Sequence, residues 1–196
     1  MKTIGLFSGS FNPIHLGHTT LASSIIESTG LDEVLFVVSP HNPLKKQSEL
    51  LDEQLRLKMV DLALQDYDNM HASDIEFRMP KPSYTVNTLR YLSAAHTDCK
   101  FRLIIGSDNL LIFNRWREYE YILEHYSVIV YPRKDDNIAR LTELYPQVQI
   151  VAAPLLPISS TQIRQAIAHS DLSIRKWLNP QVFEFIIKNN LYRTKA

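Results

Sequence analysis

Residues 5–18 read GLFSGSFNPIHLGH, and this stretch decides both the fold and the position of the functional site. The apolar run Lys2–Ser8 predicts a buried strand, and the apolar periodicity that starts at Leu16 predicts a helix. Gly9 lets the backbone turn sharply between the two and come close to a ligand. Free N–H groups at the start of a helix, together with the helix dipole, favour an anion. We therefore expect a phosphate-binding turn between the first strand and the first helix.

Two histidines, His15 and His18, stand at this turn, three residues apart. Residues at i and i+3 share one face of a helix, so both imidazoles can point into one pocket. A metal site is an alternative, but no third ligand lies nearby in the sequence and the single cysteine, Cys99, is remote. We therefore expect these side chains to bind no metal.

The string GSFNPIHLGH resembles the G-[GST]-F-[DN]-P-x-H-x-G-H signature of the nucleotidyltransferase superfamily. Asn12 stands where aspartate is commoner in the family and Ser8 where glycine is frequent, and neither change removes a donor to phosphate. The resemblance implies that His18 and His15 are catalytic. It also implies that ATP is bound by Gly9, Ser10, Phe11, His15 and His18.

A second motif, ISSTQIR at residues 158–164, follows a proline-rich run. Ser159, Ser160 or Thr161 can cap the helix predicted there, and Arg164 can reach back to the same point from one turn later. A guanidinium suits phosphate oxygens, although such a pattern is by default a plain helix cap with a surface arginine. The string resembles the I-S-S-T-x-I-R element of the same superfamily. This resemblance implies that Ser160, Thr161 and Arg164 bind the triphosphate and that Arg164 is catalytic.

A third motif, IIGSDNL at residues 104–110, predicts a buried strand that ends in a glycine turn and an acid. It is similar to the F-I-I-G-x-D-x-L element of the family. This similarity implies that Gly106 lets the nucleoside of ATP approach and that Asp108 accepts hydrogen bonds from its ribose. Arg133 occupies the position of a family basic residue near the nucleotide.

A fourth motif, PSYTVNTL at residues 82–89, resembles the P-S-Y-T-x-x-T-L segment of bacterial nicotinate mononucleotide adenylyltransferases. The N–H groups and hydroxyls of Ser83–Thr85, at the start of a predicted helix, could bind a carboxylate, although a plain helix start fits equally well. Trp116 matches a family tryptophan that stacks on the pyridine ring, whereas a tryptophan is ordinarily a packing residue. Lys46 can meet a phosphate or remain a solvated loop charge. The resemblance thus implies that the mononucleotide is bound by Lys46, Ser83, Tyr84, Thr85 and Trp116.

Composition limits the class of protein. The 196 residues suit one domain, and 21 basic residues against 21 acidic ones argue against a general binder of nucleic acid or of membrane surfaces. One cysteine suits a reducing cytoplasm, no apolar run has membrane-spanning length, and we expect no leader segment. We expect a cytoplasmic protein with a single nucleotidyltransferase domain, 1–196, on which a C-terminal helical segment (about 160–196) packs. Whether it is a monomer or a homo-oligomer stays open.

Strand-like and helix-like runs alternate along the chain. This alternation predicts an α/β fold, a Rossmann-like doubly wound, mostly parallel sheet with helices on both faces, which binds ligands at the carboxyl ends of its strands. No G-x-G-x-x-G is present, so a dehydrogenase-type site is not expected. The predicted strands are Lys2–Ser8, Glu33–Val38, Met70–Ser73, Phe101–Gly106, Ser127–Tyr131 and Gln149–Val151. The predicted helices are Leu16–Ser28, Asp52–Gln65, Thr85–Ala95, Asn109–Phe113, Glu118–His125, Ile138–Leu144, Thr161–His169 and Gln181–Asn189.

The function that the motifs imply is an adenylyltransferase. It would join ATP, carrying Mg²⁺, and nicotinate mononucleotide into deamido-NAD by direct in-line attack on the α-phosphate. Three alternatives stay open: another adenylyl- or cytidylyltransferase such as the pantetheine-phosphate enzyme, an ATP- or NAD-sensing regulator without turnover, and a class I aminoacyl-tRNA synthetase fragment. The intact histidines and Arg164 argue against the regulator, and the short chain without a basic face argues against the synthetase.

Overall fold

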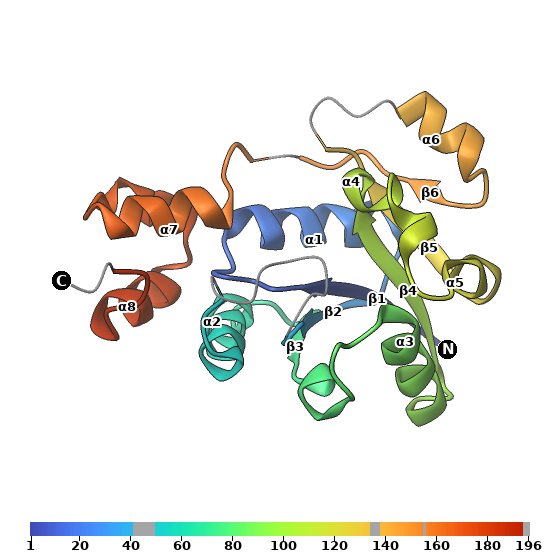
Figure 1. Cartoon of the computed structure of the whole chain (residues 1–196), viewed down its shortest axis with the longest axis horizontal. Helices are drawn as coiled ribbons and strands as arrows, with labels where there is room; N and C mark the ends of the chain where they lie inside the picture. The colour runs from blue at the N-terminus through green and yellow to red at the C-terminus, as the bar shows by residue number, and fades with distance from the viewer. Residues whose placement is uncertain (41–49, 134–137, 155, 194–196) are drawn as a thin grey trace.

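The computed structural model describes residues 1–40, 50–133, 138–154 and 156–193 of the chain. Within them, parallel strands form one sheet in the order β3-β2-β1-β4-β5-β6 (Figure 1). The chain winds from the centre to one edge, returns, and winds to the other edge, which confirms the predicted doubly wound α/β fold. The strands are β1 (Lys2–Gly9), β2 (Glu33–Val38), β3 (Met70–Ser73), β4 (Cys99–Gly106), β5 (Ser127–Tyr131) and β6 (Gln149–Ile150).

Helices cover both faces of the sheet, and each face has its own apolar core. Alternate residues of a strand point to opposite faces, so in β1 the side chain of Phe7 joins one core and that of Leu6 joins the other. The Phe7 face is covered by α1 (Leu16–Thr29), α2 (Glu53–Leu64), α7 (Ser160–Ala168) and α8 (Pro180–Lys188). The Leu6 face is covered by α3 (Thr85–Ala95), α4 (Ser107–Leu110), α5 (Tyr119–His125) and α6 (Ile138–Leu144).

Several helix ends follow from local chemistry. The Asp52 side chain accepts a hydrogen bond from the Gln54 N–H and so caps α2, and the Asn179 side chain caps α8, which has a proline at its first position. Helix α1 ends at Gly30, whose φ of 67° lies in the left-handed region that glycine adopts without strain.

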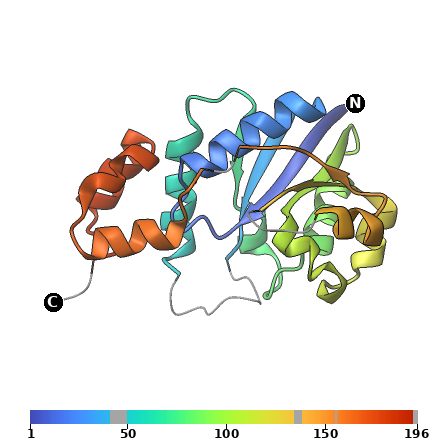
Figure 2. The ribbon, with the colours of Figure 1, turned by 90° about the horizontal axis from the view of Figure 1, so that it is seen from above.

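The C-terminal helices α7 and α8 lie on the Phe7 face of the sheet. Between α7 and α8 the chain forms the short 3₁₀ helix η4 (Leu172–Trp177). Helix α8 lies beside α2 at one end of the molecule (Figure 2), and its residues Val182 and Ile186 are fully buried in the shared core. No helix within the described ranges has the length and apolar character that a bilayer crossing requires.

The observed elements differ from the predicted ones at a few places. Strand β4 begins at Cys99 rather than Phe101, and β6 ends at Ile150 rather than Val151. The predicted helix Asn109–Phe113 is wrong, because helix α4 starts directly after Gly106 and is followed by a separate 3₁₀ turn, η3 (Phe113–Arg115). The 3₁₀ helices η2 (Ile75–Arg78) and η4 were not predicted, since such short helices have no apolar periodicity to detect.

Candidate active site

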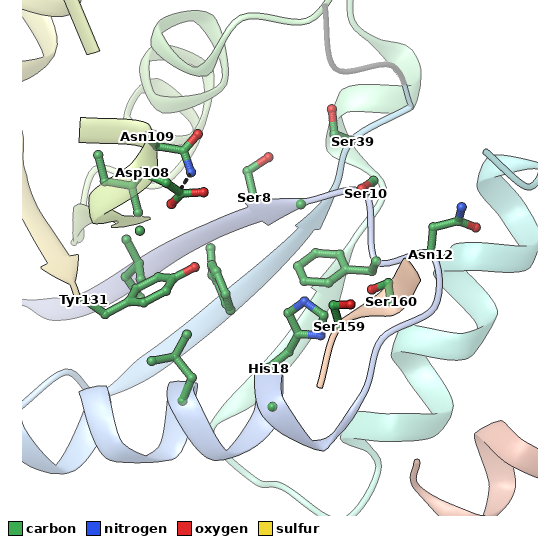
Figure 3. Close-up of a pocket in the computed structure, with 18 of the residues that line it drawn as sticks. Ser8, Ser10, Asn12, His18, Ser39, Asp108, Asn109, Tyr131, Ser159 and Ser160 are labelled. Atoms are coloured by element: carbon green, nitrogen blue, oxygen red, sulfur yellow. Dashed lines mark hydrogen bonds between the residues drawn. The ribbon is translucent and has the colours of Figure 1, made fainter. Parts of the chain in front are cut away.

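A pocket of about 680 Å³ opens at the carboxyl ends of β1 and β4. These neighbouring strands mark the point where the winding of the sheet reverses, which is the usual binding position in such folds. Figure 3 shows His18, Ser159 and Ser160 on one side of the end of β1, and Asp108 and Asn109 on the other. Every predicted site residue within the described ranges lines this pocket: Gly9, Ser10, Phe11, His15, His18, Ser83, Tyr84, Thr85, Gly106, Asp108, Trp116, Arg133, Ser160, Thr161 and Arg164. Lys46 lies outside the described residues.

The two histidines form one unit at the start of α1. Their ring centroids are 3.9 Å apart with an interplanar angle of 36°. The backbone N–H of His15 donates to Nδ1 of His18 at 3.2 Å. A neutral imidazole carries one proton, so this bond assigns the proton of a neutral His18 to Nε2. His18 is therefore held as a hydrogen-bond donor through Nε2.

His15 is buried and stays neutral near pH 7. It is 8% exposed, and within the described structure its Nδ1 is buried without a hydrogen-bond partner. Burial, and to a smaller extent the positive charge of Arg133, lower the pKa of His15 to about 4. The ring therefore acts in the pocket as a polar group without charge.

This lowered pKa makes the folded protein sensitive to acid. Between pH 6.5 and pH 4 the unfolded chain protonates His15 while the folded protein does not, so the stabilisation present above pH 6.5 is lost as the pH falls. We expect the free energy of unfolding to drop by about 2 kcal/mol from pH 7 to pH 5 on account of His15. Urea unfolding at both pH values should show a smaller drop in His15→Asn than in the wild type. Replacing the exposed His96 with glutamine is the control, and an equal drop in all three proteins would contradict this assignment.

Two glycines of the first motif are required by close packing. A Cβ atom on Gly17 would lie 2.9 Å from the imidazole ring of His15, and one on Gly9 would lie 2.9 Å from the ring of Phe11. Phe11 itself has a φ of 44° and packs edge-on against the His18 ring at 5.3 Å. A side chain at Gly17 would therefore displace the His15 ring, and one at Gly9 would displace the Phe11 ring that packs against His18.

The second motif meets the first through direct hydrogen bonds. Ser159, not Ser160 or Thr161, caps α7, and Gln162 completes a capping box. The Ser160 hydroxyl donates to the carbonyl of Pro13 at 2.8 Å. The guanidinium of Arg164 donates to the carbonyl of Asn12 at 2.9 Å and to the Thr161 hydroxyl at 3.3 Å. The N-termini of α1 and α7 therefore open onto the same pocket.

The third motif forms the other side of the pocket. Arg133 Nε lies 3.5 Å from a carboxylate oxygen of Asp108, and the Arg133 backbone N–H donates to the Ser107 hydroxyl at 2.6 Å. A Cβ atom on Gly106 would lie 2.3 Å from that carboxylate, so only glycine leaves Asp108 in place. Asp108 and Arg133 are both about half exposed and can turn towards a ligand.

The fourth motif is organised by a carboxylate that was not predicted. Glu76 is 3% exposed and accepts hydrogen bonds from the hydroxyls of Ser83 at 2.7 Å and Thr88 at 3.0 Å. In this structure the Ser83 hydroxyl donates its hydrogen bond to Glu76, and the contact predicted between Ser83 and a bound carboxylate stays a prediction. Tyr84 is the N-cap residue of α3 and forms no side-chain cap. In the described part of the chain no group accepts from the amides of Thr85 and Val86, the first two of this helix.

Trp116 lines the same side of the pocket and is partly buried. Its ring packs against Phe113 with centroids 5.1 Å apart, and its indole N–H is buried without a partner among the described residues. Trp116 therefore packs against Phe113, as is ordinary for a tryptophan, and also lines the pocket.

Arg56 was also missed, although the sequence holds a signal for it. It is 1% exposed and donates to the carbonyls of Ser10 at 2.7 Å and Ser39 at 2.8 Å, and further to Leu51 and Pro40. It shares a helical face with the apolar residues Met59, Val60 and Ala63, where an arginine is unusual. Arg56 fixes the loop after β1 against the loop after β2.

Within the described residues no group of three or more His, Cys, Asp or Glu side chains is placed to hold a metal ion.

Comparison with known proteins extends over nearly the whole chain. The model of the cytidylyltransferase-like family matches residues 6–166. A probable nicotinate-nucleotide adenylyltransferase of Flavobacterium johnsoniae is 46% identical over 97% of this chain and 98% of its own length. A protein of the same name from Cytophaga hutchinsonii is 49% identical over 96% of this chain and 97% of its own. The structure of Plasmodium falciparum nicotinic acid mononucleotide adenylyltransferase complexed with NaAD superposes with a TM-score of 0.82, covering 98% of each chain at 22% identity, and so shares the fold.

Proposed function

The chain belongs to the nicotinate-nucleotide adenylyltransferases, within the cytidylyltransferase-like family, and we propose that this pocket carries out their reaction by direct attack of one substrate on the other. The chain joins ATP and nicotinate mononucleotide to give deamido-NAD and pyrophosphate in NAD biosynthesis. An oxygen of the mononucleotide phosphate forms a bond to the α-phosphorus of ATP, and the bond from that phosphorus to the bridging oxygen of pyrophosphate breaks. The attacking phosphate is already an anion, so no general base is required.

One observation supports this assignment above the others. The starts of two helices far apart in the sequence, α1 and α7, meet in one pocket with a histidine pair between them, joined by the Arg164–Asn12 and Ser160–Pro13 hydrogen bonds. Helix starts favour phosphate, and two of them can hold different parts of one triphosphate. Catalysis then consists of holding two anions in line and stabilising the charge that develops on the α-phosphate.

The residues divide between the two substrates. His18 donates from Nε2 to the α-phosphate, His15 holds the triphosphate from the other side, and Arg164 grips the β- and γ-phosphates beside Ser160 and Thr161. Gly9, Ser10 and Phe11 shape the phosphate turn. Gly106, Asp108 and Arg133 receive the nucleoside of ATP, and Tyr84, Thr85 and Trp116 receive the mononucleotide, together with Lys46. Ser83 supports that subsite through Glu76.

The proposed function also involves a metal ion, the domain organisation of the chain and its cellular compartment. Mg²⁺ arrives bound to the triphosphate and keeps most of its waters, as this ion prefers. The chain works as one nucleotidyltransferase domain, with the segment from α7 onwards packed on the sheet. It acts in the cytoplasm, where ATP is available and where a lone cysteine such as Cys99 stays reduced.

The proposal is tested by incubating the purified chain with ATP and a panel of phosphorylated acceptors: nicotinate mononucleotide, nicotinamide mononucleotide and pantetheine phosphate. We expect pyrophosphate and deamido-NAD with the first. A product formed only with pantetheine phosphate would indicate a pantetheine-phosphate adenylyltransferase instead. ATP binding without release of pyrophosphate would indicate a nucleotide-sensing regulator without turnover.

Arg164 offers a test of the triphosphate clamp. Lysine keeps the charge but cannot donate to Asn12, Thr161 and a phosphate from one planar fork. We expect Arg164→Lys to raise the KM for ATP roughly tenfold and to leave the KM for the mononucleotide nearly unchanged. Steady-state kinetics with each substrate varied in turn measure this, with Arg175→Lys, on the exposed part of η4, as the control. Equal effects on both substrates would place Arg164 elsewhere in the reaction.

A further inference from the structure

The C-terminal turn reaches back to the phosphate-binding loop through one side chain. The hydroxyl of Tyr192 donates to Oδ1 of Asn12 at 2.9 Å, across 180 positions of sequence. The stretch after His169 contains no motif that the function accounts for. We propose that Tyr192 is a positioning residue for the reaction, which holds the loop between β1 and α1 in its ATP-binding form. This inference rests on the proposed function, because it assigns ATP to that loop.

The backbone after α8 is bent so that Tyr192 points inward. Asn190 has a φ of 51° and is the left-handed residue that ends α8, a position that asparagine tolerates. Tyr192 has a φ of 62°, in the left-handed region that a bulky residue rarely adopts. Leu191 between them is 8% exposed, joins the core of the Phe7 face, and donates its N–H to the carbonyl of Ile186 at 3.0 Å. The surrounding structure thus maintains an unfavourable backbone at Tyr192, whose hydroxyl is directed at Asn12.

Asn12 is the centre of the loop that Tyr192 contacts. It is 3% exposed, its backbone carbonyl accepts from Arg164, and its Oδ1 also accepts from the Leu51 N–H at 3.4 Å. On one side of it lies Phe11, with its left-handed backbone and its contact to His18, and on the other lies Pro13, whose carbonyl accepts from Ser160. A movement of Asn12 therefore displaces both phosphate-binding helix starts together.

The chemistry of the surroundings keeps Tyr192 a donor. Burial raises the pKa of its hydroxyl, and the nearby cations Arg164 and Arg56 only partly oppose that shift. A neutral phenol donates a hydrogen bond to the Asn12 amide oxygen and adds no negative charge to the phosphate-binding loop. Arg56 holds the Ser10 side of the same loop, so the loop is fixed from α2 and from the C-terminal turn.

The test is the substitution Tyr192→Phe, which removes the hydroxyl and keeps the ring. We expect kcat/KM for ATP to fall about tenfold and the Kd for a non-hydrolysable ATP analogue to rise about fivefold, because a misplaced loop weakens contacts to the phosphates. The KM for the mononucleotide should change less than twofold. Tyr126→Phe is the matched control, since that hydroxyl accepts from Ser93 on the opposite face of the sheet and lies outside the pocket lining.

A double-mutant cycle separates positioning from support of the fold. If Tyr192 acts through Asn12, the change Tyr192→Phe should cost nothing further in an Asn12→Ala background. The same loss in both backgrounds, or wild-type values for Tyr192→Phe, would overturn the proposal. Thermal unfolding of each variant gives the folded fraction by which the rates are divided. A wild type that binds the ATP analogue but forms no deamido-NAD would refute the proposed function alone, because the binding measurements still test Tyr192.

Discussion

Replacement of His18 with alanine is expected to lower kcat by roughly 10²–10³, about 3–4 kcal/mol of transition-state stabilisation. The His15 backbone N–H occupies Nδ1 of His18 at 3.2 Å, which leaves Nε2–H as the donor of the neutral ring. Charge on the α-phosphate oxygens increases as the mononucleotide attacks, so a donor fixed beforehand contributes most at that moment. The loss should therefore appear in kcat, while the KM for ATP stays within about threefold of the wild type.

A matched control comes from another histidine on a helix. Nδ1 of His169 lies 2.8 Å from the Gln165 carbonyl at the exposed end of α7, so His169→Ala removes an imidazole with a backbone partner outside the pocket. It should keep the wild-type kcat. A His18→Ala enzyme within threefold of the wild-type kcat would remove His18 from the mechanism.

The fold could be predicted largely because its signals are local. Apolar runs are readable within a few residues, and they placed the strands close to where they lie. The strand order could not be read in this way. It depends on the pairing of β1 with β4, in which Lys2 lies opposite Cys99, and only packing of the whole chain decides such a contact.

In the site, too, the local motifs could be predicted, whereas the contacts between distant parts of the chain could not. The histidine motif is contiguous, and the structure brings it together with the motif at Arg164 as expected. Arg56, Glu76 and Tyr192 act instead on partners that the chain brings to them from elsewhere: the Ser10 carbonyl, the Ser83 and Thr88 hydroxyls, and Asn12. A single arginine, glutamate or tyrosine in a helix or turn has no pattern that reveals such a partner. The hydrogen bond from Ser83 to Glu76 could not be predicted for the same reason, because nothing in the sequence near Ser83 points to that glutamate.

The choice between the two pyridine mononucleotides should depend on charge. Nicotinate and nicotinamide have nearly the same size and differ by a carboxylate in place of a neutral amide, and the Trp116 ring would stack on either. With the Ser83 and Thr88 hydroxyls engaged by Glu76, the donors at the start of α3 are the amides of Thr85 and Val86, reinforced by the helix dipole. An amide offers one acceptor oxygen and presents its NH₂ group to the other donor, which is then left unpaired, and such a mismatch can discriminate by orders of magnitude. We expect kcat/KM to favour nicotinate mononucleotide by at least about 100-fold.

The substitution Thr85→Pro can test which donor recognises the carboxylate. Thr85 is the first residue of α3, where proline fits the helix, and Tyr84 before it already has the extended backbone (φ −116°, ψ 135°) that a following proline requires. The substitution removes the backbone N–H together with the side-chain hydroxyl, so the loss of the hydroxyl alone has to be measured separately. We expect Thr85→Pro to lower kcat/KM for nicotinate mononucleotide about tenfold or more and to change that for nicotinamide mononucleotide little, so that the preference narrows. Thr85→Val keeps the N–H and loses only the hydroxyl, so it should retain the preference within threefold. A preference that narrows equally in Thr85→Val would assign the recognition to the hydroxyl instead. Comparable efficiencies of the wild type with both mononucleotides would mean that the pocket does not distinguish the carboxylate and that the enzyme has dual specificity.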